Sequence, residues 1–258
     1  MRVLACYKWT LDEQDIKISG ETQALDVSRA KYKISDYDKN AIEEVTLLQE
    51  TLGATTEVLT FGTAAVKQSL KDVLSRGPEQ AHYIADPAAE TADAFVTANI
   101  LAAAIRKMGA FDLVVCGEGS SDDYNQQVAP RLAALLGLPC VTYVQKLSVE
   151  GGCVKATRKL SDCTEVATVN GPAVVSVLPE INKPRIPSLK QVLGAAKKPS
   201  AEIKLADLGL ADAELAPKVT RTSLKGFVMS RKNVVYAEPN HADNVARLMA
   251  NLASEGLV

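Results

Sequence analysis

The sequence predicts a doubly wound α/β fold with a mainly parallel sheet. Through the first two thirds of the chain, short apolar runs typical of buried strands alternate with segments whose apolar residues recur at helical spacing. Three of the helical segments are followed by Gly53, Gly109 and Gly137, and glycine is the favoured residue just after a helix. Because strand–helix–strand crossovers are right-handed, this alternation favours a Rossmann-like three-layer sandwich, completed by a hairpin and a C-terminal arm.

The expected elements of the sheet follow one another without long gaps. Strands are expected at residues 3–8, 56–61, 81–84 and 113–116, and helices at residues 38–52, 64–75, 91–108 and 126–136. Thr91 is the expected N-cap of the third helix, ahead of Phe95, Ile100 and Ile105. In a sheet of this kind, ligands bind at the carboxyl ends of the strands.

The pattern changes after the fourth helix. Two alternating runs flank Gly151-Gly152 between residues 147 and 156, which predicts a hairpin at the sheet edge. A buried strand is expected at residues 172–178, and four prolines then indicate an exposed loop up to Pro199. Residues 240–252 return to helical spacing.

We therefore expect two parts. Residues 1–200 would form the α/β domain, and residues 201–258 would form an arm that ends in a helix. Arms usually clasp a partner; the alternative is an ordinary surface extension packed on its own domain.

The composition indicates a globular protein without nucleic-acid or membrane partners. The chain has 258 residues, of which 47% are apolar, and a net charge of −2 from 29 basic and 31 acidic residues. Such a balance supplies no positive field that would attract nucleic acid. The apolar run at the N-terminus is too short for a signal peptide or a membrane span, so we expect a cytoplasmic location and no membrane insertion.

Cysteine and histidine offer little for metal or nucleophilic chemistry. The five cysteines include no Cys-x-x-Cys pair, and we expect them to be reduced. The two histidines, His82 and His241, lie far apart and without nearby ligand pairs. This spacing does not fit a zinc site or a cysteine–histidine nucleophile.

A turn rich in glycine and hydroxyl groups follows the strand at residues 113–116. Residues 117–128 read Gly-Glu-Gly-Ser-Ser-Asp-Asp-Tyr-Asn-Gln-Gln-Val and run into a helix. Backbone N–H groups in such a turn can approach an anion, and the helix adds the positive end of its dipole, which favours a phosphate group. The turn has neither the spaced glycines of dinucleotide-binding proteins nor the Gly-Lys-Ser/Thr of a phosphate loop, which argues against a dehydrogenase and an NTPase.

Three segments are expected to meet at the carboxyl ends of the strands. They are Cys6-Tyr7-Lys8, Phe61-Gly62-Thr63 and the turn at residues 117–128. Asp122 and Asp123 would suit acid–base or metal chemistry, but adjacent carboxylates in a loop are expected to point apart. In the alternative, Asp122 caps the following helix while neighbouring serines hold a phosphate.

For several other residues, both a structural and a functional role are consistent with the sequence. Lys8 and the pair Lys197-Lys198 are either functional or plain solvated charges. Glu43-Glu44 is expected to be a solvated helix face. Trp9 and Tyr37 would either stack on a ligand ring or pack within the protein.

A collinear set of motifs over about residues 1–200 resembles the beta subunit of electron transfer flavoproteins, and within that family it is most similar to the FixA-type proteins. The motifs lie at residues 6–8, 12–16, 33–43, 71–78, 117–122, 126–128, 181–182, 184–190 and 193–199. No motif of the family matches about residues 211–238, whose role stays open.

The resemblance implies an electron carrier without catalytic residues of its own. The chain would pair with an alpha subunit that holds most of the redox FAD, and it would supply a nucleotide cleft and a docking surface for an acyl-CoA dehydrogenase or reductase. By position, the nucleotide contacts of the family fall on Cys6, Ser35, Asp36, Tyr37, Asp38, Phe61, Gly117, Glu118, Gly119, Ser120, Ser121, Asp122, Asp123, Tyr124, Asn125, Gln126, Gln127 and Val128.

The resemblance also implies a recognition loop at about residues 179–190. Its partner-binding residues would be Ile181, Asn182, Lys183, Pro184 and Arg185, with Ile181 as the aliphatic anchor. A loop braced by proline suits transient docking, because less entropy is lost on binding.

The family divides on the ligand of the beta cleft. Ordinary members hold AMP, and electron-bifurcating members hold a second FAD. This sequence departs from both patterns. Bifurcating relatives favour a basic residue and a different glycine placement at residues 118–124, and they carry Val-Pro-Asp where residues 9–12 read Trp-Thr-Leu-Asp. The ligand is therefore either AMP or a second FAD. FixA-type relatives are linked to carnitine-type or other acyl-CoA metabolism. From a different class, a nucleotide-hydrolysing or nucleotide-sensing protein would use the same cleft, and a plain scaffold is a third alternative.

Overall fold

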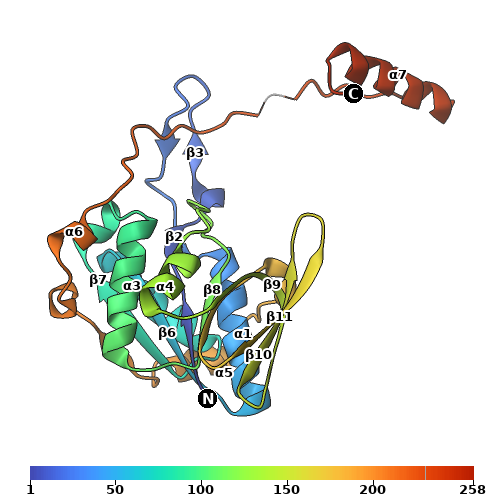
Figure 1. Ribbon diagram of the computed structural model, residues 1–258. Helices are drawn as coiled ribbons and strands as arrows, with labels where there is room; N and C mark the ends of the chain where they lie inside the picture. The colour runs from blue at the N-terminus through green and yellow to red at the C-terminus, as the bar shows by residue number, and fades with distance from the viewer. Residues whose placement is uncertain (230) are drawn as a thin grey trace. The chain divides into compact units, whose positions relative to one another are not determined.

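The computed structural model describes residues 1–229 and 231–258, which form two compact units. The larger unit comprises Met1–Lys17 and Val27–Ser223, and the smaller comprises Ile18–Asp26 and Leu224–Val258. The larger unit contains a nine-stranded sheet with its covering helices, and it therefore positions the candidate site (Figure 1).

The sheet has the strand order β11-β10-β9-β12-β8-β1-β6-β7-β13. Its strands are β1 (Arg2–Cys6), β6 (Thr55–Gly62), β7 (Gln80–Ala85), β8 (Leu113–Gly117), β9 (Cys140–Glu150), β10 (Cys153–Lys159), β11 (Thr164–Asn170), β12 (Ala173–Val177) and β13 (Ser200–Glu202). Every pairing from β9–β12 across to β7–β13 is parallel, whereas β9–β10 and β10–β11 are antiparallel. The expected mainly parallel sheet is confirmed.

Shorter elements complete the chain. Two small pairs join β2 (Trp9–Leu11) to β5 (Tyr32–Ile34) and β3 (Lys17–Ile18) to β4 (Leu25–Asp26). The α-helices are α1 (Asp36–Leu52), α2 (Leu70–Ser75), α3 (Ala94–Met108), α4 (Val128–Leu136), α5 (Leu189–Ala195), α6 (Asp212–Leu215) and α7 (His241–Ser254). The 3-10 helices are η1 (Glu13–Asp15), η2 (Ala64–Ser69), η3 (Pro87–Glu90), η4 (Pro179–Ile181) and η5 (Leu205–Leu208).

Helices cover both faces of the sheet, as the alternation of side chains along β1 shows. Val3 and Ala5 belong to one buried apolar cluster, to which α1, α2 and α5 contribute. Leu4 and Cys6 belong to a second cluster, to which α3 and α4 contribute. Since successive residues of a strand point to opposite faces, the two clusters lie on the two sides of the sheet. The three-layer sandwich expected from the sequence is confirmed (Figure 1).

Two helices begin later than expected. α3 starts at Ala94, and its N-cap is Asp93, whose carboxylate accepts a hydrogen bond from the Val96 N–H at 2.9 Å. The expected cap Thr91 is wrong, because it ends the preceding 3-10 helix η3. α4 starts at Val128 because the backbone before it is not helical.

Glycines shape the helix ends and the hairpin as predicted. Gly53 and Gly137 adopt left-handed conformations at the ends of α1 and α4. β9 and β10 are joined at Gly151 and Gly152, with φ of 58° and 81°, which is the backbone that a tight hairpin requires. The hairpin and β11 form one edge of the sheet.

The segment expected as an exposed loop contains more regular structure than the sequence indicated. α5 forms within it, capped by Ser188, whose side chain and that of Gln191 form a reciprocal capping box. Past residue 200, β13 pairs with β7 at the other sheet edge, and the larger unit continues to Ser223.

The expected C-terminal helix is α7, which begins after the N-cap Asn240. None of its residues is buried. Within the described residues, no helix has the length and apolar character needed to cross a membrane.

Candidate functional site

The candidate site lies where β8, β1 and β6 end. These three strands are adjacent and parallel, so residues after Cys6, Gly62 and Gly117 emerge at the same edge of the sheet. The Lys8 ammonium group lies 2.6 Å from the Asp122 carboxylate and 3.0 Å from that of Asp123. The expected convergence of the first and third segments is therefore present.

The start of α1 packs against both segments at this edge of the sheet, where a nucleotide cleft is expected. The Lys8 backbone N–H donates to the Asp38 carboxylate at 2.8 Å. The Ser121 hydroxyl accepts a hydrogen bond from the Asp36 N–H at 2.9 Å, and the Ser121 N–H donates to the Ser35 hydroxyl at 3.2 Å. These bonds join the turn after β8 to the first residues of α1.

Gly117 lets the turn and α1 approach closely. A Cβ atom at this position would lie 2.6 Å from the Asp38 carboxylate and 2.8 Å from the backbone carbon of Tyr37. Only a glycine leaves room for that approach. Gly119 is similar, since its Cβ would lie 2.7 Å from the Tyr124 ring.

The turn after β8 holds unusual backbone. Tyr124 and Gln126 have φ of 45° and 55°, a left-handed conformation that costs a non-glycine residue about 1–2 kcal/mol. Strain of this kind is concentrated at ligand sites, where surrounding contacts hold it in place. α4 then begins without a side-chain cap at Gln127, so the N–H groups of its first turn remain available as donors.

This donor set fits an anionic phosphate. Uncapped N–H groups at a helix N-terminus bind phosphate without requiring a lysine. The lysine present, Lys8, is already neutralised by two carboxylates. The arrangement therefore favours a nucleotide bound mainly by backbone.

Carboxylates of the cleft have perturbed pKa values. Burial raises the pKa of Asp38 to about 7, against hydrogen bonds from the backbone N–H groups of Lys8 and Gly117 that lower it. Burial also raises the pKa of Glu118. Such buried acceptors suit the hydroxyl and amino groups of a nucleoside rather than its phosphate.

The ion pairs of Lys8 shift pKa values in both partners. Burial lowers the pKa of Lys8, but the charges and hydrogen bonds of Asp122 and Asp123 outweigh it and raise that pKa above its ordinary value. Burial raises the pKa of Asp122, but the Lys8 charge outweighs it and lowers that pKa. Asp123 also accepts a hydrogen bond from the Arg221 guanidinium.

Two of the predicted site residues, Cys6 and Phe61, have buried side chains. Both lie in the apolar cluster on the α3 and α4 side, together with Cys116. Their side chains therefore belong to the core. Cysteines are free throughout the described residues, and no group of three His, Cys, Asp or Glu side chains among those residues is placed to hold a metal ion.

The structure corrects local expectations about the cleft. Asp122 is not a helix N-cap, since α4 begins six residues later. Asp122 and Asp123 do not point apart, because Lys8 draws both carboxylates to one ammonium group. Lys8 is paired with these two carboxylates, while 41% of its side chain remains exposed.

The two aromatic candidates have partners within the chain. The Trp9 ring is stacked on that of Tyr32, with centroids 6.2 Å apart. The Tyr37 ring lies 5.0 Å from that of Tyr124, in a tilted arrangement across the cleft rim. The Tyr37 contact adds a second link between α1 and the turn.

A comparison with known protein families agrees with this geometry. The sequence profile of the family described as the electron transfer flavoprotein domain matches residues 23–208, more than two thirds of the chain. The chain belongs to the electron transfer flavoprotein family. Proteins of this family are electron carriers that generally bind flavin and act with a partner subunit and dehydrogenases. The matched residues include most of the cleft.

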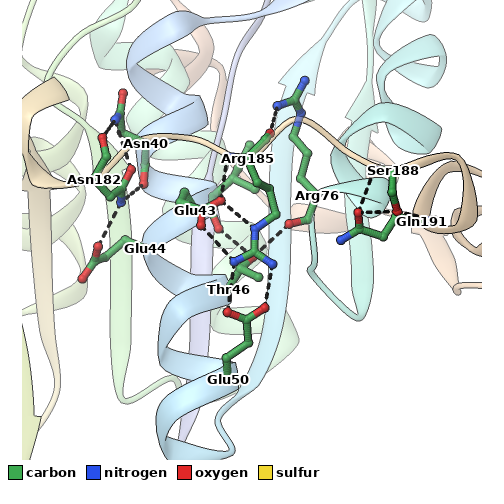
Figure 2. Close-up of polar contacts among 11 residues, drawn as sticks. Asn40, Glu43, Glu44, Thr46, Glu50, Arg76, Asn182, Arg185, Ser188 and Gln191 are labelled. Carbon is green, nitrogen blue, oxygen red and sulfur yellow. Dashed lines mark hydrogen bonds and ion pairs between the residues drawn. The ribbon is translucent and has the colours of Figure 1, made fainter.

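The family match also covers the expected recognition loop. Ile181 is only partly exposed and packs against the core cluster on the α1 side. Asn182 and Arg185 point toward α1, as Figure 2 shows. The exposed large apolar side chains in and just after this loop are instead Ile186, Leu189 and Leu193, with 92%, 74% and 61% of their surface accessible. Leu189 and Leu193 are four residues apart in α5, a spacing that places them on one side of the helix, whereas Ile186 precedes the helix.

Glu43 and Glu44 are a further correction in this electron transfer flavoprotein. Both were expected on a solvated helix face, yet both are buried. Glu43 binds Arg185, and Glu44 accepts a hydrogen bond from Asn182 at 2.9 Å. The helical period of α1 could not reveal them, because their partners lie about 140 residues away.

The smaller unit exposes many apolar side chains. They include Leu224, Phe227, Val228, Met229, Val234, Val235, Val245, Leu248 and Met249. Large exposed apolar surfaces of this kind mark interaction sites.

Proposed function

We propose that this chain is the FixA-type beta subunit of a heterodimeric electron transfer flavoprotein that exchanges electrons with an acyl-CoA dehydrogenase or reductase. The family match supports the electron-transfer role, and the resemblance in motif order supports the beta subunit. The convergence of residues 35–38 and 117–128 at the carboxyl ends of the strands is the observation that carries the proposal.

The proposed ligand of the cleft is AMP, with a second FAD as the alternative. The phosphate would lie at the start of α4 and against Ser120 and Ser121, and the buried Asp38 and Glu118 would bind or orient polar groups of the nucleoside. FAD held together with the alpha subunit would supply the redox chemistry. The residues of this chain bind and orient the nucleotide and carry no catalytic step.

The smaller unit, with Leu224–Val258, is proposed to clasp the alpha subunit. Its helix α7 presents Val245, Leu248 and Met249 on one side, and none of its residues is buried. An amphipathic helix with an uncovered apolar side is stabilised by packing against another surface. The alpha subunit is the occupant to which we commit.

The docking surface for the dehydrogenase is proposed to be the segment from Ile186 to Leu193. Within the expected loop at residues 179–190, Lys183 and Pro184 precede the segment, and Ile181 packs inward. We therefore assign the anchor to Leu189 and its neighbours Ile186 and Leu193 in place of Ile181. Three exposed aliphatic side chains, two on the short helix α5 and Ile186 just before it, are suited to a transient apolar contact.

The deciding experiment identifies the bound nucleotides. The chain is purified alone and with its alpha subunit, the protein is denatured, and the released nucleotides are quantified by mass spectrometry. One AMP and one FAD per heterodimer are expected. Two FAD would assign the chain to the bifurcating class instead.

The same preparations separate the electron carrier from a nucleotide-hydrolysing protein. We expect flavin only in the heterodimer and no release of ADP or AMP from added ATP. Hydrolysis by the chain alone, with no flavin retained by the pair, would overturn the proposed function.

A further inference from the structure

Arg185 joins the loop before the docking segment to two carboxylates of α1. The Arg185 guanidinium donates to Glu43 through Nε at 2.8 Å and Nη2 at 2.9 Å, and to Glu50 through Nη1 at 2.6 Å and Nη2 at 3.1 Å. The Arg185 backbone N–H donates to Glu43 as well, at 3.0 Å. Figure 2 shows this fork between two carboxylates that lie seven residues apart on one side of the helix.

Neighbouring residues hold the same loop. The Asn40 amide donates to the backbone oxygens of Pro179 and Asn182, at 3.0 and 2.9 Å. Asn182 returns a hydrogen bond to the Asn40 backbone oxygen at 3.0 Å. Arg76 donates to the backbone oxygen of Arg185 at 3.2 Å. Hydrogen bonds to both its side chains and its backbone therefore hold the loop in place.

A second cation holds the other end of the docking segment. Lys198 is half-buried, and its ammonium group donates to the backbone oxygens of Leu74, Gly77 and Pro78 at 2.7–2.9 Å. Arg185 and Lys198 both line one cavity of about 270 Å³ next to α5. Arg185 and Lys198 therefore hold the two ends of residues 186–197, which include the docking segment, and both side chains line the same cavity.

We propose that Arg185, held by Glu43, is a positioning residue for the docking segment. It does not itself form the apolar contact. Its fork fixes the point from which Ile186 and α5 leave the body of the protein, so that Leu189 is presented in one orientation before the partner arrives. This inference rests on the proposed docking function, but the order that it assigns to the segment is a property of the chain alone.

The chemistry of the site favours arginine over lysine. A guanidinium group can make two parallel hydrogen bonds to each of two carboxylates, whereas an ammonium group acts as a point charge. Glu43 is buried, so removal of its partner would leave a carboxylate without adequate hydrogen bonds and would favour a rearranged loop. Hydrogen bonds with Glu43 and Glu50 also raise the pKa of Arg185, so its charge persists at every accessible pH.

The test compares four variants of the assembled heterodimer. Arg185→Gln and Glu43→Gln remove the fork from either side, and Leu189→Ala removes the proposed anchor. Arg158→Gln is the matched control, because Arg158 also joins a carboxylate (Glu165) and a backbone oxygen, but on the hairpin. Arg185→Lys is added in case either fork variant fails to fold.

Two measurements are made on each variant. Amide hydrogen exchange over residues 186–196 is followed in the free heterodimer by mass spectrometry. Steady-state electron transfer is measured with an acyl-CoA dehydrogenase from the same organism, so that KM for the flavoprotein is separated from kcat. Flavin content and melting temperature report whether the fold is intact.

The fork variants are expected to exchange about tenfold faster over residues 186–196 and to raise KM about five- to tenfold, with kcat and flavin content unchanged. Arg185→Lys should fall between them and the wild type, and Arg158→Gln should match the wild type in both. Unchanged exchange in Arg185→Gln, or unchanged KM while Leu189→Ala raises it, would overturn the inference. If Leu189→Ala leaves KM unaltered, the proposed docking surface fails, and the exchange data still decide whether Arg185 orders the segment.

Discussion

Substitution of Gly117 by alanine tests the architecture of the cleft most directly. The added Cβ would lie 2.8 Å from the Tyr37 backbone carbon and 3.0 Å from the Asp38 backbone nitrogen. Neither atom belongs to a flexible side chain, so the first turn of α1 or the end of β8 must shift by about 0.6 Å to restore a contact of 3.4 Å. Overpacking of this kind costs about 1–3 kcal/mol.

The shift would fall on the groups proposed to bind the nucleotide. It would strain the hydrogen bond between the Lys8 N–H and Asp38 and the bonds between Ser121 and the start of α1. We therefore expect Gly117→Ala to lower the free energy of unfolding by about 1–3 kcal/mol and to lose AMP or FAD from the cleft on desalting. Urea unfolding and nucleotide content by mass spectrometry measure the two effects.

Gly194→Ala is the matched control for Gly117→Ala. Gly194 lies in α5, has no left-handed φ, and a Cβ there would meet nothing within 4 Å. Alanine in a helix interior is favoured over glycine by about 1 kcal/mol, so this variant should be neutral or more stable, with the nucleotide retained. If Gly117→Ala behaves like Gly194→Ala in both measurements, the close approach of α1 to the turn does not determine the cleft.

Two further substitutions address buried charges. Burial raises the pKa of Asp38 from 3.8 to about 7, so the folded protein favours the protonated carboxyl group. Wild-type stability should therefore fall as the pH rises from 4 to 7 and the buried group ionises. In urea unfolding, Asp38→Asn should gain stability relative to the wild type across that window, and a pH-independent difference would contradict this expectation. The Glu57 carboxylate lies 2.5 Å from the Arg2 guanidinium and 2.7 Å from the His82 ring. Glu57→Gln should therefore lower the free energy of unfolding by about 1–3 kcal/mol at neutral pH. Nucleotide content should be unchanged, because these contacts lie at the opposite end of the strands.

The fold was predictable from the sequence because its signals are local and periodic. Val3 and Ala5 alternate with Leu4 and Cys6, and this alternation is enough to place β1 between two helical layers. The end of the strand then locates the cleft, because a doubly wound sheet binds ligands at that edge. The first and third candidate segments are in contact as predicted, through Lys8 with Asp122 and Asp123.

The polar contacts between segments far apart in the sequence were not predictable in the same way. Lys8 meets Asp123 across 115 positions of sequence, and Arg185 meets Glu43 across 142. No period links such residues, so each charge taken alone resembles a solvated one. The N-cap of α3 could not be predicted from local sequence either. Both Thr91 and Asp93 can accept a backbone hydrogen bond, and only the tertiary placement of α3 makes Asp93 the cap.

Helix α1 connects the two proposed sites. Its first turn, residues 36–38, borders the nucleotide cleft, and Glu43 and Glu50 hold Arg185 farther along. At a rise of 1.5 Å per residue, the cleft and the farther carboxylate are about 20 Å apart on one rigid element. A displacement imposed at the cleft should therefore reach the docking segment, whereas loosening of the fork should not reach the nucleotide. Gly117→Ala is accordingly expected to impair both nucleotide retention and docking. Arg185→Gln is expected to impair docking alone. If Gly117→Ala left docking intact while Arg185→Gln released the nucleotide, α1 would not carry the coupling.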